Sequence, residues 1–198
     1  MSEILLFHHA WGQTPGFLAW AHALRQAGHT VHTPDLFEGQ VFSRLEDGVA
    51  HAQRIGFEEI SERGVRAAQK LPASLVYVGM SLGVMPAQRL AMTRPGAAGA
   101  VLIEACVPLE YVGGVWPAGV PVQVHGRDGD PVFGGDGDLE AARSLVRSTP
   151  SAELFLYPGD QHLFADASLP SYDAASAALL TRRVLSFLEM SSAQRHSA

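Results

Sequence analysis

The chain has 198 residues, of which 47% are hydrophobic and 17% are charged, so it is long enough to bury a substantial core. Its formal net charge is −6 and its longest basic run is Arg182-Arg183, which argues against nucleic acid and membranes as partners. We predict a single domain over residues 1–198, with a core at about residues 4–189 and a polar tail at 191–198.

No stretch of the sequence resembles a targeting or membrane segment. The apolar runs are far shorter than a membrane span requires, and Met1-Ser2-Glu3 does not begin a signal peptide. A single cysteine, Cys106, excludes an internal disulfide and fits a reducing compartment. We therefore expect a cytoplasmic protein.

The N-terminal part of the chain predicts a strand, a helix and a second strand. Residues 4–8 are apolar on both faces, the pattern of a strand buried in a parallel sheet. Thr14 is the expected N-cap of the helix, with Pro15 at its first position and Gly28 as its stop. A short second strand follows at residues 30–32.

The next elements lead to a serine motif. Helices are predicted at residues 43–55, 58–71 and 84–92, with a strand at residues 75–78. Between that strand and the last helix lies Gly79-Met80-Ser81-Leu82-Gly83, a G-x-S-x-G motif in the strand-to-helix context of a nucleophile elbow. Such a turn holds a serine hydroxyl above the carboxyl edge of a parallel sheet, so Ser81 is a candidate nucleophile. The alternative interpretation is a glycine-rich turn without chemistry.

The rest of the chain continues the alternation of strands and helices. Strands are expected at residues 99–103, 120–124 and 152–156, and loops at 108–119, 125–137 and 158–170. Helices are expected at residues 139–147, with Asp138 as N-cap, and at 172–189. Six strands alternating with helices predict a doubly wound, mostly parallel α/β sheet. Because ligands bind beyond the carboxyl ends of such strands, the loops there are the place to look for chemistry.

Three of these loops carry a serine, an aspartate and a histidine in that order. They supply Ser81, then Asp130 or Asp128, and His162, which is the chain order of a triad on an α/β-hydrolase sheet. A serine hydroxyl needs an imidazole to accept its proton, and the imidazole needs a carboxylate to fix its tautomer. We favour Asp130 over Asp128 because it leaves more chain after the strand to turn toward His162, although either could cap its own loop.

An oxyanion hole needs two backbone N–H groups aimed at the developing charge. Leu82 supplies one, and the loop after the first strand supplies the other from Ala10, with Trp11 as the alternative. Trp11 and Glu104, which follows the fourth strand, are also candidate pocket residues. We interpret Cys106 as a small buried residue in preference to a second nucleophile.

We expect no metal ion and no cofactor. The adjacent residues His8 and His9 point to opposite faces of a strand, and no H-x-x-x-H pair is present to supply two ligands from one helix.

Over residues 4–189 the sequence resembles the dienelactone hydrolase family of α/β hydrolases. The matching pieces are the first-strand loop ending in Gly12, Pro34-Asp35-Leu36-Phe37, the turn at Ser81, the Asp130 loop, and Gly159-Asp160-Gln161-His162-Leu163-Phe164 followed by Tyr172-Asp173-Ala174-Ala175. The resemblance implies a compact α/β-hydrolase fold.

Two features depart from the pattern of that family. The namesake enzymes have a cysteine nucleophile where this chain has Ser81, and serine is the nucleophile of general esterases. They also hold the lactone carboxylate with a glutamate in the first-strand loop and with arginines around the pocket. Here His9 stands at the glutamate position, and Asp166 stands four residues past His162. His9 is thus a further candidate pocket residue, and dienelactone itself is disfavoured as the substrate.

The sequence therefore predicts a serine hydrolase that cleaves a small carboxylic ester, thioester or lactone through an acyl-enzyme. Ser81 would attack, His162 would relay the proton and Asp130 would orient the imidazole. One alternative is a hydrolase-fold binding or sensing protein with a vestigial triad. Another is a perhydrolase or acyltransferase that uses the same nucleophile.

Overall fold

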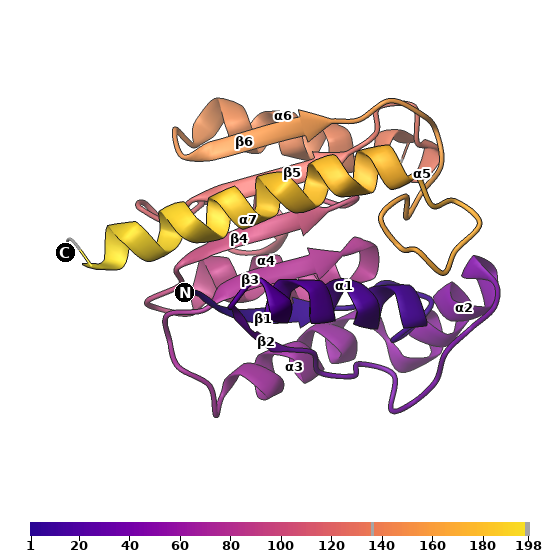
Figure 1. The fold of residues 1–198 in the computed structure, drawn as a ribbon. Coiled ribbons are helices and arrows are strands. Elements are labelled where there is room, and N and C mark those ends of the chain that lie inside the picture. The colour runs from indigo at the N-terminus through magenta and orange to yellow at the C-terminus, as the bar shows by residue number, and fades with distance from the viewer. Residues whose placement is uncertain (136, 197–198) are drawn as a thin grey trace.

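A six-stranded sheet in which every neighbouring pair is parallel forms the centre of the fold (Figure 1). The computed structural model describes residues 1–135 and 137–196. The strand order is β2-β1-β3-β4-β5-β6, with β1 (Glu3–Phe7), β2 (Thr30–His32), β3 (Val76–Met80), β4 (Gly99–Ile103), β5 (Val122–Gly126) and β6 (Ala152–Leu156). The doubly wound α/β sheet expected from the sequence is confirmed, and it is parallel throughout.

Helices cover both faces of this sheet. One face carries α1 (Pro15–Gln26) and α7 (Ala174–His196), which lie in front of the strands in Figure 1. The other face carries α2 (Leu45–Ile55), α3 (Phe57–Ala68), α4 (Val84–Thr93) and α6 (Asp138–Ser148). Three short helices lie in loops, η1 (Ser81–Gly83), η2 (Leu109–Tyr111) and α5 (Pro131–Gly135). Among the residues described, no helix is long and apolar enough to cross a bilayer.

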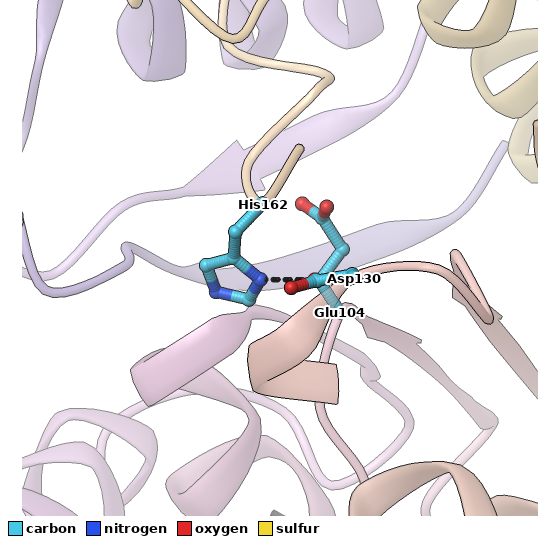
Figure 2. Close-up of side chains that lie close together, drawn as sticks. All are labelled: Glu104, Asp130 and His162. Atoms are coloured by element: carbon cyan, nitrogen blue, oxygen red, sulfur yellow. Dashed lines mark hydrogen bonds and ion pairs between the residues drawn. The ribbon is translucent and has the colours of Figure 1, made fainter. Parts of the chain in front are cut away.

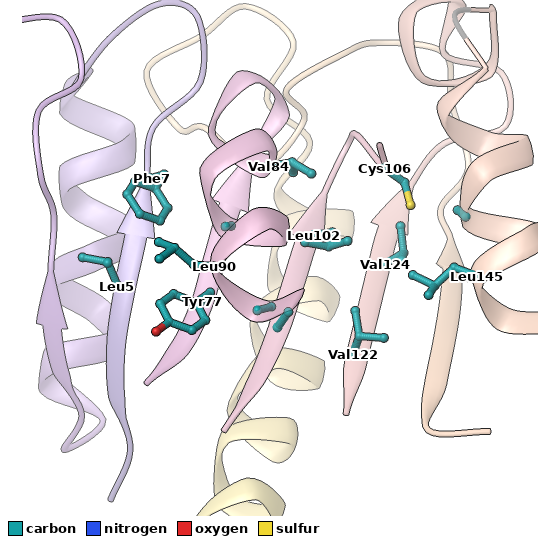
Figure 3. Close-up of a cluster of buried hydrophobic side chains, with 14 of the residues drawn as sticks. Leu5, Phe7, Tyr77, Val84, Leu90, Leu102, Cys106, Val122, Val124 and Leu145 are labelled. Atoms are coloured by element: carbon teal, nitrogen blue, oxygen red, sulfur yellow. The ribbon is translucent and has the colours of Figure 1, made fainter. Parts of the chain in front are cut away.

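The core consists of two layers, one on each face of the sheet. Successive side chains of a strand point to opposite faces, so Leu5 and Phe7 join the layer beneath α3 and α4 (Figure 3), whereas Ile4 and Leu6 pack against α1 and α7. The four inner strands are buried on both faces for this reason.

The path of the chain through the sheet creates one crevice at its carboxyl edge. From β1 the chain moves outward to β2 and then crosses back to β3 on the other side of β1. The carboxyl ends of β1 and β3 therefore form the topological switch point, where ligands bind in open α/β sheets. The loops that leave these two ends carry Ala10 and Ser81.

Three local expectations were wrong. The segment 125–137, expected as a loop, contains α5, because Pro131 starts a helix well and the Asp130 carboxylate accepts the N–H of Val132 as a cap. The N-cap of α6 is Gly137, in a left-handed conformation, and Asp138 lies inside the helix. The last helix begins at Ala174, not at residue 172, and continues to His196.

The C-terminal extension of α7 has a packing reason. The side chains of Ser191 and Ser192 are buried, and the hydroxyl of Ser2 lies 2.8 Å from that of Ser192 and donates to the carbonyl of Leu188. The predicted polar tail at 191–198 is thus helical as far as His196, and its last two residues lie outside the described part of the chain.

Candidate active site

Ser81 occupies the turn between β3 and α4, within η1. Its φ of 48° is left-handed, a conformation that costs energy for a residue with a side chain and often marks a functional site. A Cβ on Gly83 would lie 2.4 Å from the carbonyl oxygen of Phe7, so only glycine lets the turn approach β1 this closely. The sharp turn predicted from the motif is therefore present, and it leaves Ser81 half-buried.

The side chains of Ser81, His162 and Asp130 form a continuous hydrogen-bonded chain. The Ser81 Oγ lies 2.9 Å from His162 Nε2. On the other side of the ring, His162 Nδ1 lies 2.5 Å from Asp130 Oδ2, the contact drawn in Figure 2. The carboxylate can only accept a hydrogen bond, so Nδ1 carries the proton of the neutral imidazole. Nε2 is then unprotonated and can accept the serine proton. Residues from three loops, predicted as a set from their order, meet at the carboxyl edge.

Asp130 is the aspartate that faces His162, and Asp128 is not. The Asp130 side chain is buried, whereas Asp128 is exposed. Asp130 also caps α5, since its Oδ1 accepts the N–H of Val132 at 2.8 Å. The two roles that sequence offered as alternatives, capping the loop and orienting the histidine, are thus both filled by one carboxylate, one oxygen for each.

The surroundings of His162 favour its charged form. Burial lowers the pKa of His162, but the hydrogen bond to Asp130 and the charges of Glu104, Asp130 and Asp138 outweigh this effect and raise the pKa above its ordinary value. An imidazole with a raised pKa is a stronger base toward the serine hydroxyl, and its imidazolium is stabilised once formed.

The oxyanion hole predicted from the sequence uses backbone N–H groups from the loops after β1 and β3. The N–H of Ala10, which lies outside the helices and strands, donates to no acceptor among the described residues, and the N–H of Leu82 belongs to the first turn of η1, where N–H groups have no intrahelical partner. The N–H of Trp11, the alternative to Ala10, donates instead to His9 Nδ1 at 3.3 Å. Ala10 and Leu82 therefore remain the candidate pair of donors.

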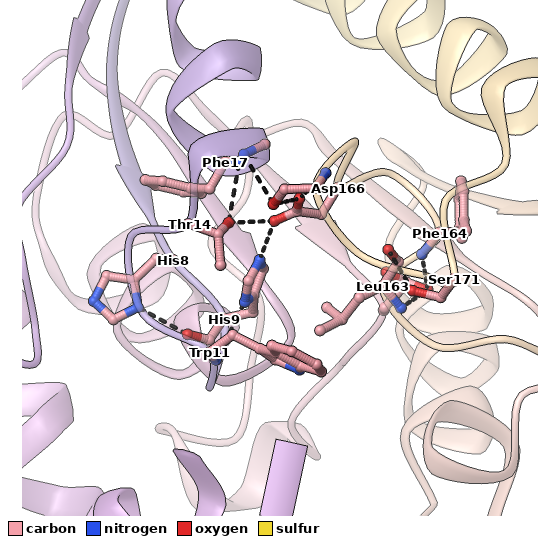
Figure 4. Close-up of polar contacts among 12 residues, drawn as sticks. His8, His9, Trp11, Thr14, Phe17, Leu163, Phe164, Asp166 and Ser171 are labelled. Carbon is pink, nitrogen blue, oxygen red and sulfur yellow. Dashed lines mark hydrogen bonds and ion pairs between the residues drawn. The ribbon is translucent and has the colours of Figure 1, made fainter. Parts of the chain in front are cut away.

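His9 does not line an open pocket, because it is fully buried against Asp166 (Figure 4). Its Nε2 lies 2.8 Å from Asp166 Oδ2, and its Nδ1 accepts from Trp11. Asp166 also accepts hydrogen bonds from the hydroxyls of Thr14 and Ser168. The two pocket positions at which the sequence departs from the family pattern are therefore in direct contact, and they tie the first-strand loop to the His162 loop.

His8 holds the same loop from the opposite side. Its Nε2 accepts the N–H of Leu36 at 2.9 Å, and its Nδ1 donates to the carbonyl of His9. Its ring also packs edge-on against Phe37. Adjacent histidines at the end of β1 point to opposite faces, as expected, and each fixes the loop that carries Ala10.

Arg127 is a site-forming residue that sequence reasoning missed. It is buried, its guanidinium donates to Asp173 at 2.7 Å, and it stacks on the ring of Phe164 with 4.5 Å to the centroid. It therefore joins the Asp130 loop to the His162 loop and to the start of α7. No local pattern in the sequence announces this contact, because Arg127 and Asp173 are 46 residues apart.

Glu104 and Cys106 follow β4, and both are buried. The Glu104 carboxylate accepts the N–H groups of Leu163 and Phe164, so it faces the His162 loop and not an open pocket. Burial raises the pKa of the Cys106 thiol to about 12, which agrees with its interpretation as a small apolar residue.

One group of side chains in the described residues, Glu104, Asp130 and His162, is spaced closely enough to hold a metal ion. The hydrogen bonds among these groups and to the backbone account for all three side chains without one. A separate hollow of about 420 Å³ lies between α3 and α4 and is lined by Met85, Arg89 and Tyr111 among others. Its lining does not include Ser81, Asp130 or His162, so we place the candidate site at the switch point.

Solved structures with the same fold include several hydrolases. The dienelactone hydrolase-like promiscuous phosphotriesterase P91, from metagenomic libraries, has 18% identity and a TM-score of 0.76, covering 96% of this chain and 86% of P91. A protein of Klebsiella pneumoniae subsp. pneumoniae assigned to the dienelactone hydrolases has 18% identity and a TM-score of 0.74, with 96% and 87% covered. The esterase Est2 of Thermogutta terrifontis has 17% identity and a TM-score of 0.58, with 94% and 83% covered. These likenesses show the α/β-hydrolase fold.

The family is shown by the sequence. No curated protein matches the chain, but the model of the dienelactone hydrolase family matches residues 1–192. The match spans nearly the whole chain and confirms the resemblance drawn from the separate motifs. The chain belongs to the dienelactone hydrolase family and is a hydrolase of that type.

Proposed function

We propose that the protein is a serine hydrolase that cleaves small, uncharged carboxylic esters, thioesters or lactones through an acyl-enzyme on Ser81. The observation that carries the proposal is the chain of contacts from Ser81 Oγ to His162 Nε2 and from His162 Nδ1 to Asp130. This chain lies at the switch point of the sheet, beside the candidate oxyanion donors Ala10 and Leu82.

The steps follow from the positions of these groups. His162 takes the proton of Ser81 as the oxygen attacks the carbonyl carbon, and the N–H groups of Ala10 and Leu82 bind the oxyanion of the tetrahedral intermediate. His162 then gives the proton to the leaving alcohol or thiol. Water, activated by the same imidazole, releases the acid and restores Ser81.

The proposed preference for uncharged substrates rests on the charges beside the site. The two sequence positions that hold the lactone carboxylate in the namesake enzymes carry His9 and Asp166 here, and these two side chains are buried and paired with each other. The basic residue of the Asp130 loop, Arg127, is buried and paired with Asp173. None of these three residues offers an unpaired cation for a substrate carboxylate, which favours uncharged substrates over anionic ones.

The test compares 4-nitrophenyl acetate with the monoanionic 4-nitrophenyl hemisuccinate, on the wild type and on Ser81→Ala. We expect hydrolysis that depends on Ser81, with kcat/KM at least about tenfold higher for the acetate. A faster reaction with the hemisuccinate would contradict the proposed preference. Residual activity of Ser81→Ala above a few per cent would contradict the nucleophile.

Product analysis separates the alternatives that share this site. A perhydrolase or acyltransferase would pass the acyl group to peroxide or to an alcohol in preference to water. A binding or sensing protein with a vestigial triad would show no turnover and would be stabilised by ligand alone.

A further inference from the structure

Glu104 brings a second carboxylate to the triad. It follows β4 directly, with a left-handed φ of 58°, and its side chain is buried. One carboxylate oxygen of Glu104, one of Asp130 and one ring nitrogen of His162 all lie within 4.8 Å of one another. Figure 2 shows the Glu104 carboxylate extending past Asp130 toward the backbone of the loop that carries His162.

The contacts of Glu104 are with the two residues that follow the histidine. Its Oε1 accepts the N–H of Leu163 at 2.8 Å and that of Phe164 at 3.4 Å. Leu163 has a φ of 62°, a conformation that a residue with a branched side chain adopts only when its surroundings hold it there. The turn that follows His162 is thus held in place by a buried acceptor.

We propose that Glu104 is a positioning residue for the proposed reaction: it fixes the turn that aims His162 Nε2 at Ser81 and supplies negative charge beside the imidazole. Asp130 holds the ring from the side of Nδ1, and Glu104 holds the backbone behind it. The inference rests on the proposed function, because it assigns His162 as the base.

The charge of Glu104 links this geometry to pH. Burial raises the pKa of Glu104 to about 7, so its ionisation falls in the range where His162 also titrates, and the two groups titrate as a coupled pair. The charged or titratable groups that act on His162 come from each neighbouring element: Glu104 after β4, Asp130 after β5, Asp138 in α6 and His9 after β1. Removal of the Glu104 charge lowers the pKa of His162, since a nearby anion favours the imidazolium.

The substitution that isolates this charge is Glu104→Gln. The amide oxygen of glutamine still accepts the N–H groups of Leu163 and Phe164, so the turn is kept. With 4-nitrophenyl acetate we expect kcat at alkaline pH to stay within about threefold of the wild type, while the acidic limb of kcat/KM moves to lower pH by about one unit. Glu110→Gln, at an exposed glutamate in η2, is the matched control and leaves the profile unchanged.

Glu104→Ala removes both the acceptor and the charge. We expect its kcat to fall about 10- to 100-fold with little change in KM, because a misaimed base slows the chemical step and not substrate binding. If this variant fails to fold, the Glu104→Gln profile still decides the matter. A Glu104→Gln profile that superimposes on that of the wild type would overturn the proposal.

A measurement without turnover separates this proposal from the proposed function. In the inactive Ser81→Ala background, NMR titration of the His162 ring reports its pKa directly. We expect a lower pKa when Glu104→Gln is added and no change when Glu110→Gln is added. An unchanged His162 pKa would overturn the inference about Glu104 even if the wild type hydrolyses esters.

Discussion

The carboxyl edge of the sheet carries two histidine–aspartate pairs that differ in where the second ring nitrogen points. In the pair of His162 and Asp130 the contact is 2.5 Å, and the other nitrogen faces Ser81. In the pair of His9 and Asp166 the contact is 2.8 Å, and the other nitrogen accepts a backbone N–H. The first imidazole can exchange a proton with a hydroxyl, whereas the second has both nitrogens committed to structure.

The electrostatics of the two pairs differ in the same sense. Burial lowers the pKa of His9 despite the hydrogen bond to Asp166, which favours its neutral form. For His162, the hydrogen bond to Asp130 and the charges of Glu104, Asp130 and Asp138 outweigh burial and raise the pKa. A nearby aspartate alone therefore does not make a histidine a base, because burial and the second contact decide its role.

The largest effect is expected from Ser81→Ala. Loss of the nucleophile should lower kcat/KM for a neutral ester by at least about 10⁴-fold, since triad members act as a unit. The melting temperature should change little, because the Ser81 hydroxyl is half-buried and lies in a strained turn. Ser43→Ala, at an exposed serine, is the control in the same assay. If Ser81→Ala retained activity, proton exchange between His162 and the Ser81 hydroxyl would no longer distinguish the His162–Asp130 pair from the His9–Asp166 pair.

The next largest loss of activity is expected when the carboxylate of Asp130 is replaced. Asp130→Asn should lower kcat by about 10³- to 10⁴-fold, because an amide leaves the imidazole in the wrong tautomer. Asp128→Asn should stay within about twofold of the wild type, as its side chain is exposed and does not face His162. Steady-state kinetics of both variants would contradict the assignment if their effects were reversed.

The elements could be predicted because their signals are local, and the meeting of Ser81, Asp130 and His162 could be predicted because each lies in a loop at the same edge of the sheet. The strands are short apolar runs, and the order of Ser81, Asp130 and His162 along the chain matches the order of the loops that carry them. The helix α5 was missed because it has only five residues, too few for a helical period to be recognised. Once α5 is present, Asp130 is its cap as well as the partner of His162.

The supporting contacts could not be predicted, because they join residues distant in the sequence. His9 and Asp166 are 157 residues apart, and Glu104 and Leu163 are 59 apart. The sequence marked His9 and Asp166 as departures from the family pattern and predicted His9 to line the pocket. Their contact shows that the two departures belong together, which no periodicity or motif could indicate.

The pair of His9 and Asp166 should affect stability more than chemistry. Asp166→Ala leaves the buried His9 without its partner and removes acceptors for Thr14 and Ser168. We expect the free energy of unfolding to fall by about 2–4 kcal/mol. Urea denaturation measures this change. A variant as stable as the wild type would show that the pair does not hold the loop.

The same variant should keep its nucleophile. We expect kcat to fall only about tenfold, through displacement of the Ala10 N–H from the oxyanion. Asp173→Ala, which removes a half-exposed partner of Arg127, is a matched control for loss of an aspartate beside the His162 loop. A loss of kcat in Asp166→Ala as large as that in Asp130→Asn would erase the contrast between the pairs.

The smallest expected effect is on the pH dependence of stability, to which His9 and His162 should contribute in opposite directions. The pKa of His9 is lowered by folding, so its contribution to stability is present above about pH 6.5 and is lost as the pH falls. The pKa of His162 is raised by folding, so its contribution is present below about pH 6.5 and is lost as the pH rises through the folded-state pKa.

Thermal unfolding of His9→Gln and His162→Gln between pH 5 and 8 checks these signs. The difference in melting temperature between the wild type and His9→Gln should shrink toward acid pH, and that for His162→Gln should shrink toward alkaline pH. If the melting-temperature difference from the wild type changed with pH in the same direction for both variants, the assigned surroundings of the two rings would be contradicted.

The most direct measurement of the central claim is intact-mass spectrometry after incubation with a small fluorophosphonate. The wild type should gain one adduct, with the modified peptide containing Ser81, because the reagent needs a serine activated by a base and an oxyanion hole. The adduct should be absent from Ser81→Ala and should form much more slowly in His162→Gln. An unmodified wild type, or an adduct that persists in Ser81→Ala, would contradict the account.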